Sequence, residues 1–453
     1  MPHTLVLLAI FILLAGVLTH VVPAGEFTRF KDAAGRLIIV PGTFHLVAAR
    51  PVAFFAVPAE LIKGLLKASH VVYYVIIIGG TSEIVTRTGM IRAFTGRMAQ
   101  ALQGREAWVI PIFMGVFAVA GFTMGMSSEV LIFIPIGIIA ARSVGFDTVT
   151  GTAMILLGTH LGFIAGLFNP FTTGIAQAIA QVPIFSGLWL RVVVLVVFLV
   201  VTSLYTARYA CRVKADPARS VVADLPELNE PDDKDAMVAL KAKHFVVLAI
   251  IVVGLTGLLY GATTKKWLFD EMAALFLSMG IVSGFAAGFN PNQVARYFMD
   301  GSRRILYGAL IIGFSGAIIV VLEDGKVVDS IIYYLVNCLN YLPIFMRPLG
   351  MYAVNLLISP VILSASGMAM ATIPVMAPVA DLLHISRQTA VLIFQFGNDI
   401  THLVLPTTAA TMGALAAAKI PYERWLKWVW PLFLAWIVMG GLFILFAVAI
   451  GYK

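Results

Sequence analysis

The chain has 453 residues, of which 60% are hydrophobic and only 12% are charged, and its mean hydropathy is +0.96. A soluble globular chain has about 45–50% apolar and about 25% charged residues, so a water-soluble fold of this size is excluded and a polytopic membrane protein is predicted. The net charge of +8 comes from 31 Lys and Arg that lie mainly between apolar segments. Because these cations are not interleaved with aromatic residues, no nucleic-acid partner is expected.

The apolar segments, taken in chain order, differ in length. They are residues 4–22, 71–85, 107–122, 130–141, 148–181, 188–205, 245–260, 272–288, 305–322, 352–363, 368–380, 389–417 and 428–450. A helix needs about 20 apolar residues to cross the hydrocarbon core. The short neighbouring runs within 107–141 and within 352–380 are typical of re-entrant hairpins. We therefore predict an all-α polytopic fold with two such hairpins.

Two long apolar runs are interrupted by polar residues. Run 148–181 contains Asn169-Pro170, and run 389–417 contains Asn398-Asp399 followed by Pro406. Broken helices at membrane depth are tolerated only where protein covers them or where they line a cavity. We expect both runs to be broken transmembrane helices.

The polar stretch 208–244 divides the chain almost in half. We interpret it as a cytoplasmic linker between a first half, 1–207, and a second half, 245–453. The first half begins with a membrane span, followed by an extramembrane loop at 23–51. Segments 90–104 and 329–342 are amphipathic and are expected to lie along the membrane interface.

The two halves share an ordered set of residues that indicates an internal repeat. The matching pairs are Pro135 with Pro374 and Gly158 with Gly397 at a shift of 239 residues, and Pro170 with Pro406, Thr172 with Thr408, Trp189 with Trp425 and Arg191 with Lys427 at a shift of 236. If both hairpins return to the side they entered, 18 of the 31 Lys and Arg fall on the linker side. The positive-inside rule then places that side in the cytoplasm. The first hairpin opens inward and the second outward, which makes the repeats inverted, as in many secondary transporters.

Three acidic side chains lie within apolar runs or at their interruptions. A charge at the bilayer centre costs about 2.5–3.5 kcal/mol on insertion scales. Glu83 precedes Arg87 by four residues, which favours a structural ion pair. Glu129 follows the small-residue link of the first hairpin, where it either caps the second arm or takes part in function. Asp399 lies at the second helix break, where it either serves function or pairs with His402 and Asn398.

The breaks and hairpin tips supply the candidate site. Oxygen-rich helix breaks suit Na⁺ or a proton, and helix amino ends suit a substrate carboxylate. The predicted substrate-binding residues are Ser127, Ser128, Glu129, Asn169, Pro170, Thr172, Thr173, Ser364, Ser366, Thr407 and Thr408. The predicted cation-binding residues are Glu129, Asn169, Asn398, Asp399 and Thr401, with Na⁺ a candidate at Asn398 and Asp399. His160 aligns with Asp399 in the repeat, although a lone membrane His is more often a packing residue.

The four elements contain no Lys or Arg. An anionic cargo would therefore be held by helix amino ends, hydroxyls and co-bound cations. A cationic cargo would meet Glu129 or Asp399 directly, and the charge census leans slightly toward this alternative.

Several segments together resemble a known family, the YfcC-type carriers, which are grouped with the anaerobic four-carbon dicarboxylate carriers (DcuC-like) of the ion transporter superfamily. The segments that carry the resemblance are Val21-Val22-Pro23-Ala24-Gly25-Glu26-Phe27, Val40-Pro41-Gly42-Thr43, Asn169-Pro170-Phe171-Thr172, Ile175-Ala176-Gln177, and Arg208-Tyr209-Ala210 with Val213-Lys214-Ala215-Asp216-Pro217. The resemblance implies a homodimer whose protomers contain a scaffold part and an elevator-like transport part. It also implies that the hairpin tips and helix breaks bind cation and substrate. The tips Ser127-Ser128 and Ser364-Ala365-Ser366-Gly367 depart from the family pattern, and the family contains both basic amino acid antiporters and dicarboxylate carriers.

These observations predict a secondary active transporter for a small amino acid or carboxylate, coupled to H⁺ or Na⁺ or acting by exchange. The expected location is the bacterial cytoplasmic (inner) membrane. No phosphate-binding Gly-x-x-x-x-Gly-Lys loop is present, so neither direct ATP coupling nor a cofactor is expected. A passive channel and an intramembrane hydrolase that uses Glu129 and Asp399 are the alternatives of other classes, and the protein is not expected to be an enzyme.

Overall fold

The computed structural model describes residues 4–31, 37–102, 106–225, 239–265, 267–360, 362, 364–406 and 408–453. Most of these residues are helical. Seven of the described helices are long and apolar enough to cross a membrane. The prediction of a mostly helical polytopic membrane protein is confirmed.

The helices follow one another with short connections. Before the linker they are α1 (Thr4–Val21), η1 (Phe54–Ala56), α2 (Val57–Lys67), α3 (Ser69–Arg87), α4 (Met90–Ala101), α5 (Glu106–Met124), η2 (Ser128–Phe133), α6 (Ile134–Ser143), α7 (Thr148–Ala165), α8 (Thr173–Ile179), α9 (Leu188–Ala215) and η3 (Pro217–Arg219). After the linker they are α10 (Ala242–Thr264), α11 (Phe269–Ala286), α12 (Pro291–Asp324), α13 (Val328–Asn340), η5 (Ile344–Met346), α14 (Arg347–Ile358), α15 (Ala365–Leu382), α16 (Arg387–Asp399), η6 (Thr401–Leu403), α17 (Ala409–Ala417) and α18 (Tyr422–Ala449). Helix α9 therefore continues eight residues past the predicted start of the linker at residue 208.

Four short strands lie between α1 and α2. Strand β1 (Gly25–Glu26) pairs antiparallel with β4 (His45–Leu46), and β2 (Arg29–Lys31) pairs antiparallel with β3 (Leu37–Ile39). Asp329 of α13 fastens these strands to the helices, because its Oδ2 accepts from the Phe27 amide at 2.8 Å and from Arg29 Nη1 at 2.9 Å. The expected surface loop is thus a small β structure held against α13.

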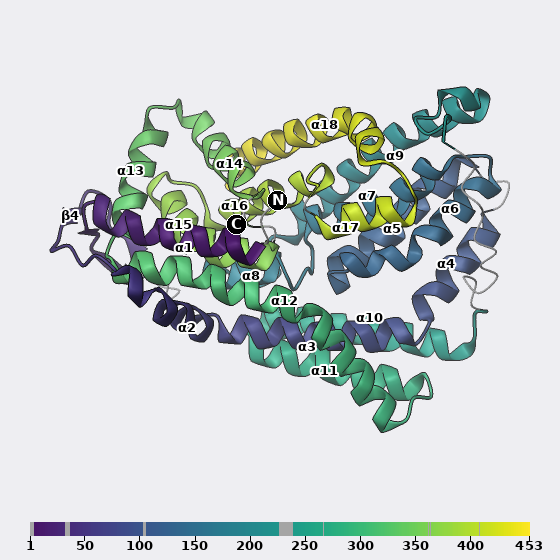
Figure 1. Cartoon of the computed structure of the whole chain (residues 1–453), viewed down its shortest axis with the longest axis horizontal. Coiled ribbons are helices and arrows are strands. Elements are labelled where there is room, and N and C mark those ends of the chain that lie inside the picture. Colours follow the sequence, from purple (N-terminus) through teal and green to yellow (C-terminus); the bar gives the residue numbers. More distant parts are fainter. Residues whose placement is uncertain are drawn as a thin grey trace.

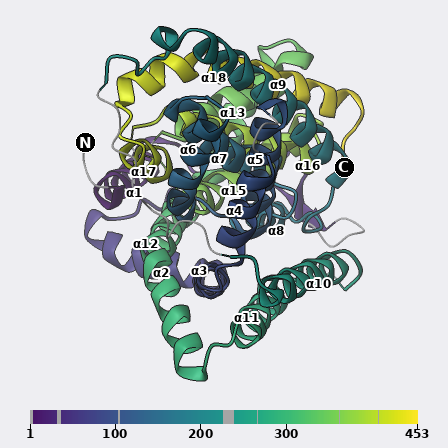
Figure 2. The same ribbon diagram turned by 90° about the vertical axis from the view of Figure 1, so that its right-hand side faces the viewer.

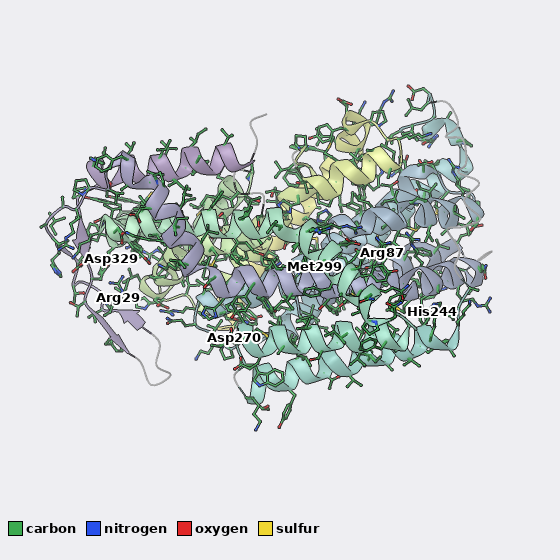
Figure 3. All side chains as sticks on the ribbon, turned by 60° about the horizontal axis from the view of Figure 1, so that its bottom comes forward. Arg29, Arg87, His244, Asp270, Met299 and Asp329 are labelled. Atoms are coloured by element: carbon green, nitrogen blue, oxygen red, sulfur yellow. The ribbon has the colours of Figure 1, made fainter. Side chains whose placement is uncertain are left out.

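The helices form two layers. Helices α3, α10, α11 and α12 lie side by side along one face, and we call them the arm (Figures 1 and 2). Helices α5–α9 and α14–α18 form the other layer, which we call the bundle (Figure 2). Figure 3 shows Arg87 and His244 at one end of the molecule, and Arg29 and Asp329 at the opposite end.

Small residues allow α5 and α7 of the bundle to pack closely. A Cβ atom added at Gly158 would lie 2.8 Å from the Met114 carbonyl oxygen, and one added at Gly162 would lie 2.2 Å from the Ala118 carbonyl oxygen. Membrane helices associate through such close backbone contacts because lipid supplies no hydrophobic driving force between them. These glycines therefore hold α7 firmly against the first arm of the first hairpin.

The two ends of the first hairpin lie near each other. Lys214 at the end of α9 donates to the Val144 carbonyl oxygen at 3.0 Å and forms an ion pair with Glu106. Glu106 begins α5 and Val144 follows α6, so the chain enters and leaves this hairpin at one end of the molecule. The connection between α13 and α14, which precedes the second hairpin, lies at the other end (Figure 1).

Candidate substrate and ion site

The first helix break closes on its own backbone. Helix α7 ends at Ala165, and Gly166 follows with φ +56°, a left-handed conformation that favours glycine. Asn169 Oδ1 accepts from the amides of Phe171 at 2.9 Å and Thr172 at 3.1 Å. Its Nδ2 donates to the Gly121 carbonyl oxygen at 3.1 Å. Asn169, which is fully buried, therefore uses its side chain to shape the break and to attach it to α5.

The second helix break contains a buried carboxylate. Helix α16 ends at Asp399, a single turn η6 follows, and α17 begins at Ala409. Asp399 is 1% exposed. Its carboxylate accepts from Asn398 Nδ2 at 2.8 Å and from Gln395 Nε2. These amide donors partly compensate the cost of burying the charge.

Gln395 links the second break to the first. Its Nε2 donates to Thr172 Oγ1 at 3.1 Å and also contacts the Phe163 carbonyl oxygen, and its Oε1 accepts from Thr173 Oγ1 at 3.0 Å. The two breaks, more than 220 residues apart in sequence, are therefore in direct contact. The sequence analysis missed Gln395. The available signal was a polar side chain one turn before Asp399 on an apolar helix.

The second hairpin tip also contacts the first break. Ser364 is the N-cap of α15 and its hydroxyl accepts from the Gly367 amide at 3.2 Å. Ser366 Oγ donates to the Phe171 carbonyl oxygen at 2.6 Å. In the first tip, Gly125 has φ +61°, and a Cβ atom there would lie 2.1 Å from the Phe171 ring. Both tips therefore meet at Phe171.

A cavity of about 300 Å³ lies between the bundle and the arm. The two hairpin tips and the second break contribute Ser127, Ser364, Ser366, Asp399, His402 and Thr408 to its wall, and α7 contributes His160. Helices α3 and α12 of the arm complete the wall with Val75, Gly79, Ser82, Ile305 and neighbouring residues. Its lining among the described residues includes one carboxylate and no Lys or Arg.

Three polar atoms in this wall have no hydrogen-bond partner among the described residues. They are His160 Nε2, His402 Nε2 and Thr408 Oγ1. Buried polar atoms are normally hydrogen-bonded, because an unsatisfied one costs about 1–3 kcal/mol. All three belong to residues that line the same cavity. The arrangement is suited to a polar ligand that supplies the missing partners.

A second group of oxygens lies behind Asp399. Ser359 Oγ is 2.6 Å from Thr401 Oγ1 and 3.1 Å from the Asn398 carbonyl oxygen, and Thr401 Oγ1 is 2.9 Å from that carbonyl. Asn398 Oδ1 is buried without a partner. Hydroxyl, carbonyl and carboxamide oxygens beside a carboxylate are the donor set that an unwound helix offers to Na⁺. The residues at this break therefore fit such an ion, and Ser359 is the member that the sequence analysis missed.

The predicted site residues fall into separate groups. Ser127, Ser364, Ser366, Asp399 and Thr408 line the cavity. The polar side-chain atoms of Asn169, Thr172, Thr173 and Thr401 are hydrogen-bonded inside the protein, and Pro170 lies within the first break. The side chains of Ser128 and Glu129, and the whole of Thr407, lie outside the described part of the structure.

Two ion-pair alternatives have clear outcomes. Glu83 pairs with Arg87 as predicted, with Arg87 Nε 2.7 Å from Oε1, and Arg304 Nη1 is a second partner 2.7 Å from Oε2. The alternative in which Asp399 pairs with His402 is not observed, because Asn398 and Gln395 are the groups bonded to the Asp399 carboxylate.

The layered helices, paired helix breaks and enclosed polar cavity define the chain as a multi-pass membrane transporter. The chain belongs to the DcuC family, "C4-dicarboxylate anaerobic carrier", whose model matches residues 1–449. This confirms the resemblance found in the sequence, and it also agrees with the expectation that the protein is not an enzyme.

Two curated relatives match most of the chain. One is the "Putative basic amino acid antiporter YfcC" of Escherichia coli (strain K12), with 28% identity over 100% of this chain and 97% of that protein. The other is an uncharacterized protein of Haemophilus influenzae, with 25% identity over 91% of this chain and 82% of that protein.

Two solved structures share the fold. The YdaH transporter of Alcanivorax borkumensis, whose crystal structure "reveals an unusual topology", has a TM-score of 0.68 and 15% identity and covers 100% of this chain and 99% of its own. MtrF of Neisseria gonorrhoeae, described with "a class of antimetabolite efflux pumps", has a TM-score of 0.68 and 13% identity and covers 99% of this chain and 95% of its own. At these identities the likeness supports the fold alone.

Proposed function

We propose that this protein is a secondary active transporter that moves a small amino acid across the bacterial cytoplasmic membrane, by exchange or by coupling to Na⁺ or H⁺. The observation that carries the proposal is the 300 Å³ cavity, in which both hairpin tips and the second helix break meet the arm. Its volume is at the lower end of the range for ligand pockets, about 300–1,000 Å³. It is therefore suited to a small metabolite.

The chemistry of the wall supports a cargo that carries charges of both signs. Asp399, the carboxylate in the described wall, favours an ammonium or guanidinium group. The amino end of α15 at Ser364 and the unpartnered Thr408 hydroxyl favour a carboxylate on the same molecule. An amino acid with a basic side chain would satisfy both, and this agrees with the name of the Escherichia coli relative.

The oxygens behind Asp399 are the proposed ion site. Ser359, Asn398 and Thr401 would turn their oxygens from one another toward Na⁺, and Asp399 would supply the balancing charge. In a proton-coupled mechanism the Asp399 carboxylate would instead take the proton. Because Asp399 also borders the cavity, the ion and the cargo would share one charged group, which couples their binding.

The two layers support an elevator-type movement. In this proposal the bundle carries the site and slides along the arm, and a second copy of the chain completes a homodimer. The half-chains 1–207 and 245–453 form inverted repeats joined by the linker, with hairpins that open to opposite sides. The opposite placement of the α5–α6 end and the α13–α14 connection supports this arrangement (Figure 1).

Cysteine labelling tests the inverted arrangement. In a variant whose exposed Cys211 and Cys338 are replaced by Ser, Glu106→Cys and Tyr341→Cys are introduced one at a time. We expect a membrane-impermeant maleimide to reach residue 106 only from the cytoplasmic side and residue 341 only from the other side. Labelling of both from the same side would contradict the inverted topology.

A four-carbon dicarboxylate is the second candidate cargo. The family's description favours it, as do the two unpartnered His Nε2 atoms, which can donate to carboxylates when they carry protons. In this case a cation at Asp399 would have to neutralise the wall before the dianion enters. The two candidates therefore differ in whether cation binding must precede the cargo.

Counterflow into proteoliposomes tests the proposed function. Vesicles loaded with arginine, ornithine, aspartate or malate are assayed for uptake of the labelled compound, with Na⁺ and pH gradients varied separately. We expect counterflow of a basic amino acid, and malate counterflow would replace it with the second candidate. Flux without counterflow for any compound would indicate a channel and overturn the carrier proposal.

A further inference from the structure

A second pocket, of about 440 Å³, lies away from the central cavity. It is enclosed by the end of α3, the turn into α4, the amino end of α10 and the middle of α12. Five cations line it, namely Arg87, Arg92, Lys241, Lys243 and Arg304, together with His244. Figure 3 shows Arg87 and His244 close to each other at the end of the molecule opposite Asp329.

The one carboxylate in the described lining is already used. Glu83 is 3% exposed in its side chain, and its two oxygens are bonded to Arg87 Nε and Arg304 Nη1, both at 2.7 Å. Arg87 and Arg304 nevertheless stay about half exposed, at 45% and 56% of their side chains. Like charges gathered around a concavity raise the local concentration of counter-ions. The pocket therefore keeps an excess of positive charge after its internal pairing.

A polar atom inside the pocket also lacks a partner. Thr86 Oγ1 is buried and has no hydrogen-bond partner among the described residues, and Thr86 is part of the lining. A solvated basic surface would leave such a hydroxyl in contact with water. A buried hydroxyl among several cations is instead the arrangement that binds oxyanions, because a phosphate accepts from both kinds of donor.

The surface below the pocket is apolar. From Phe245 onward α10 exposes Phe245 at 53%, Val246 at 49%, Val252 at 54% and Val253 at 72% of their surface. Lys241 and Lys243 stand at the start of the same helix, so a charged end and an apolar face follow one another along α10. A phospholipid has this same division, and basic pockets between membrane helices bind anionic headgroups.

We infer that this pocket binds the phosphate of an anionic phospholipid, with the acyl chains lying along α10. By the placement of Lys and Arg the pocket faces the cytoplasmic leaflet. The same two helices serve both sites, because Ser82 of α3 and Ile305 of α12 line the central cavity while their neighbours Glu83 and Arg304 line this pocket. A bound headgroup would thus hold together the part of the arm that faces the cargo.

Lipid binding by the purified full-length protein tests this inference. Native mass spectrometry in detergent would compare phosphatidylglycerol with phosphatidylcholine, and thermal unfolding would be followed with each lipid and with inorganic phosphate. We expect phosphatidylglycerol to bind about tenfold more tightly than phosphatidylcholine, which corresponds to about 1.4 kcal/mol, and to raise the unfolding temperature more than phosphate does.

The test variant is Arg92→Gln with Lys241→Gln, which removes two lining charges but keeps both ion pairs of Glu83. The matched control is Arg208→Gln with Arg212→Gln, which removes two charges from α9 outside the pocket. We expect only the first pair to lose the preference for phosphatidylglycerol. Retained preference in that variant, equal loss in the control, or stabilisation by inorganic phosphate without any lipid preference would each overturn the inference.

Discussion

The two helix breaks occupy matching places in the two halves of the sequence, yet their polar atoms are used differently. At the first break, Asn169 uses its side chain to cap Phe171 and Thr172 and to hold Gly121. At the second, Asp399 is a buried carboxylate beside an unpartnered Asn398 Oδ1.

The difference shows that a repeated sequence pattern does not require repeated chemistry. The first break is held rigid by hydrogen bonds within the protein, and the second retains unsatisfied atoms that a ligand or ion can bond. Gln395 connects them, because it contacts Thr172 and Thr173 on one side and Asp399 on the other. We therefore expect substitutions at the first break to affect mainly stability, and substitutions at the second to affect mainly transport.

The largest effect is expected at Asp399. Replacing its carboxylate by an isosteric amide in Asp399→Asn removes the charge on which both cation and cargo would depend. Cation-driven uptake into proteoliposomes should fall by about 100-fold or more, which corresponds to about 2.7 kcal/mol. The protein should still elute as a folded species in size-exclusion chromatography.

Asp224→Asn is the matched control for that change, because Asp224 is exposed at the linker and pairs with Arg424. It should transport as the wild type does. Wild-type uptake by Asp399→Asn would remove this carboxylate from the mechanism and leave the two breaks functionally alike.

Asn169→Ala should act on stability. The substitution leaves two amides and one carbonyl oxygen of the first break without their partner, and the expected loss is about 2–4 kcal/mol in the free energy of unfolding. The measurement is chemical denaturation in detergent. The fully buried Asn355, whose Nδ2 makes one bond to the Met351 carbonyl oxygen, gives a control, and Asn355→Ala should cost about 1 kcal/mol. A changed half-saturation for cargo with unchanged stability would show instead that Asn169 binds ligand.

The smallest effect is expected for the contact between the breaks. Thr173→Val removes the donor to Gln395 Oε1, and Gln395→Leu removes the acceptor. A double-mutant cycle on the free energy of unfolding should give a coupling of about 1 kcal/mol. A coupling near zero would mean that the two breaks behave independently, despite their contact in the structure.

Much of the fold followed from local sequence patterns. Hydropathy identified the membrane helices, and the polar interruptions at Asn169-Pro170 and Asn398-Asp399 predicted where α7 and α16 end. The pairing of Glu83 with Arg87 followed from helical spacing, but the second partner, Arg304, did not. Its position on α12, 221 residues away, leaves no trace in the local pattern.

The sequence by itself determined that the protein lies in a membrane, and where its helices give way to polar residues, because both depend on composition within a short window. Only the tertiary structure decided which of those polar atoms are already bonded and which face a cavity. Asn169 is satisfied because the Gly121 carbonyl oxygen lies beside it. His160 and His402 remain unpartnered because the hairpin tips and the arm enclose a space around them. Whether a buried group is satisfied depends on neighbours that are distant along the chain.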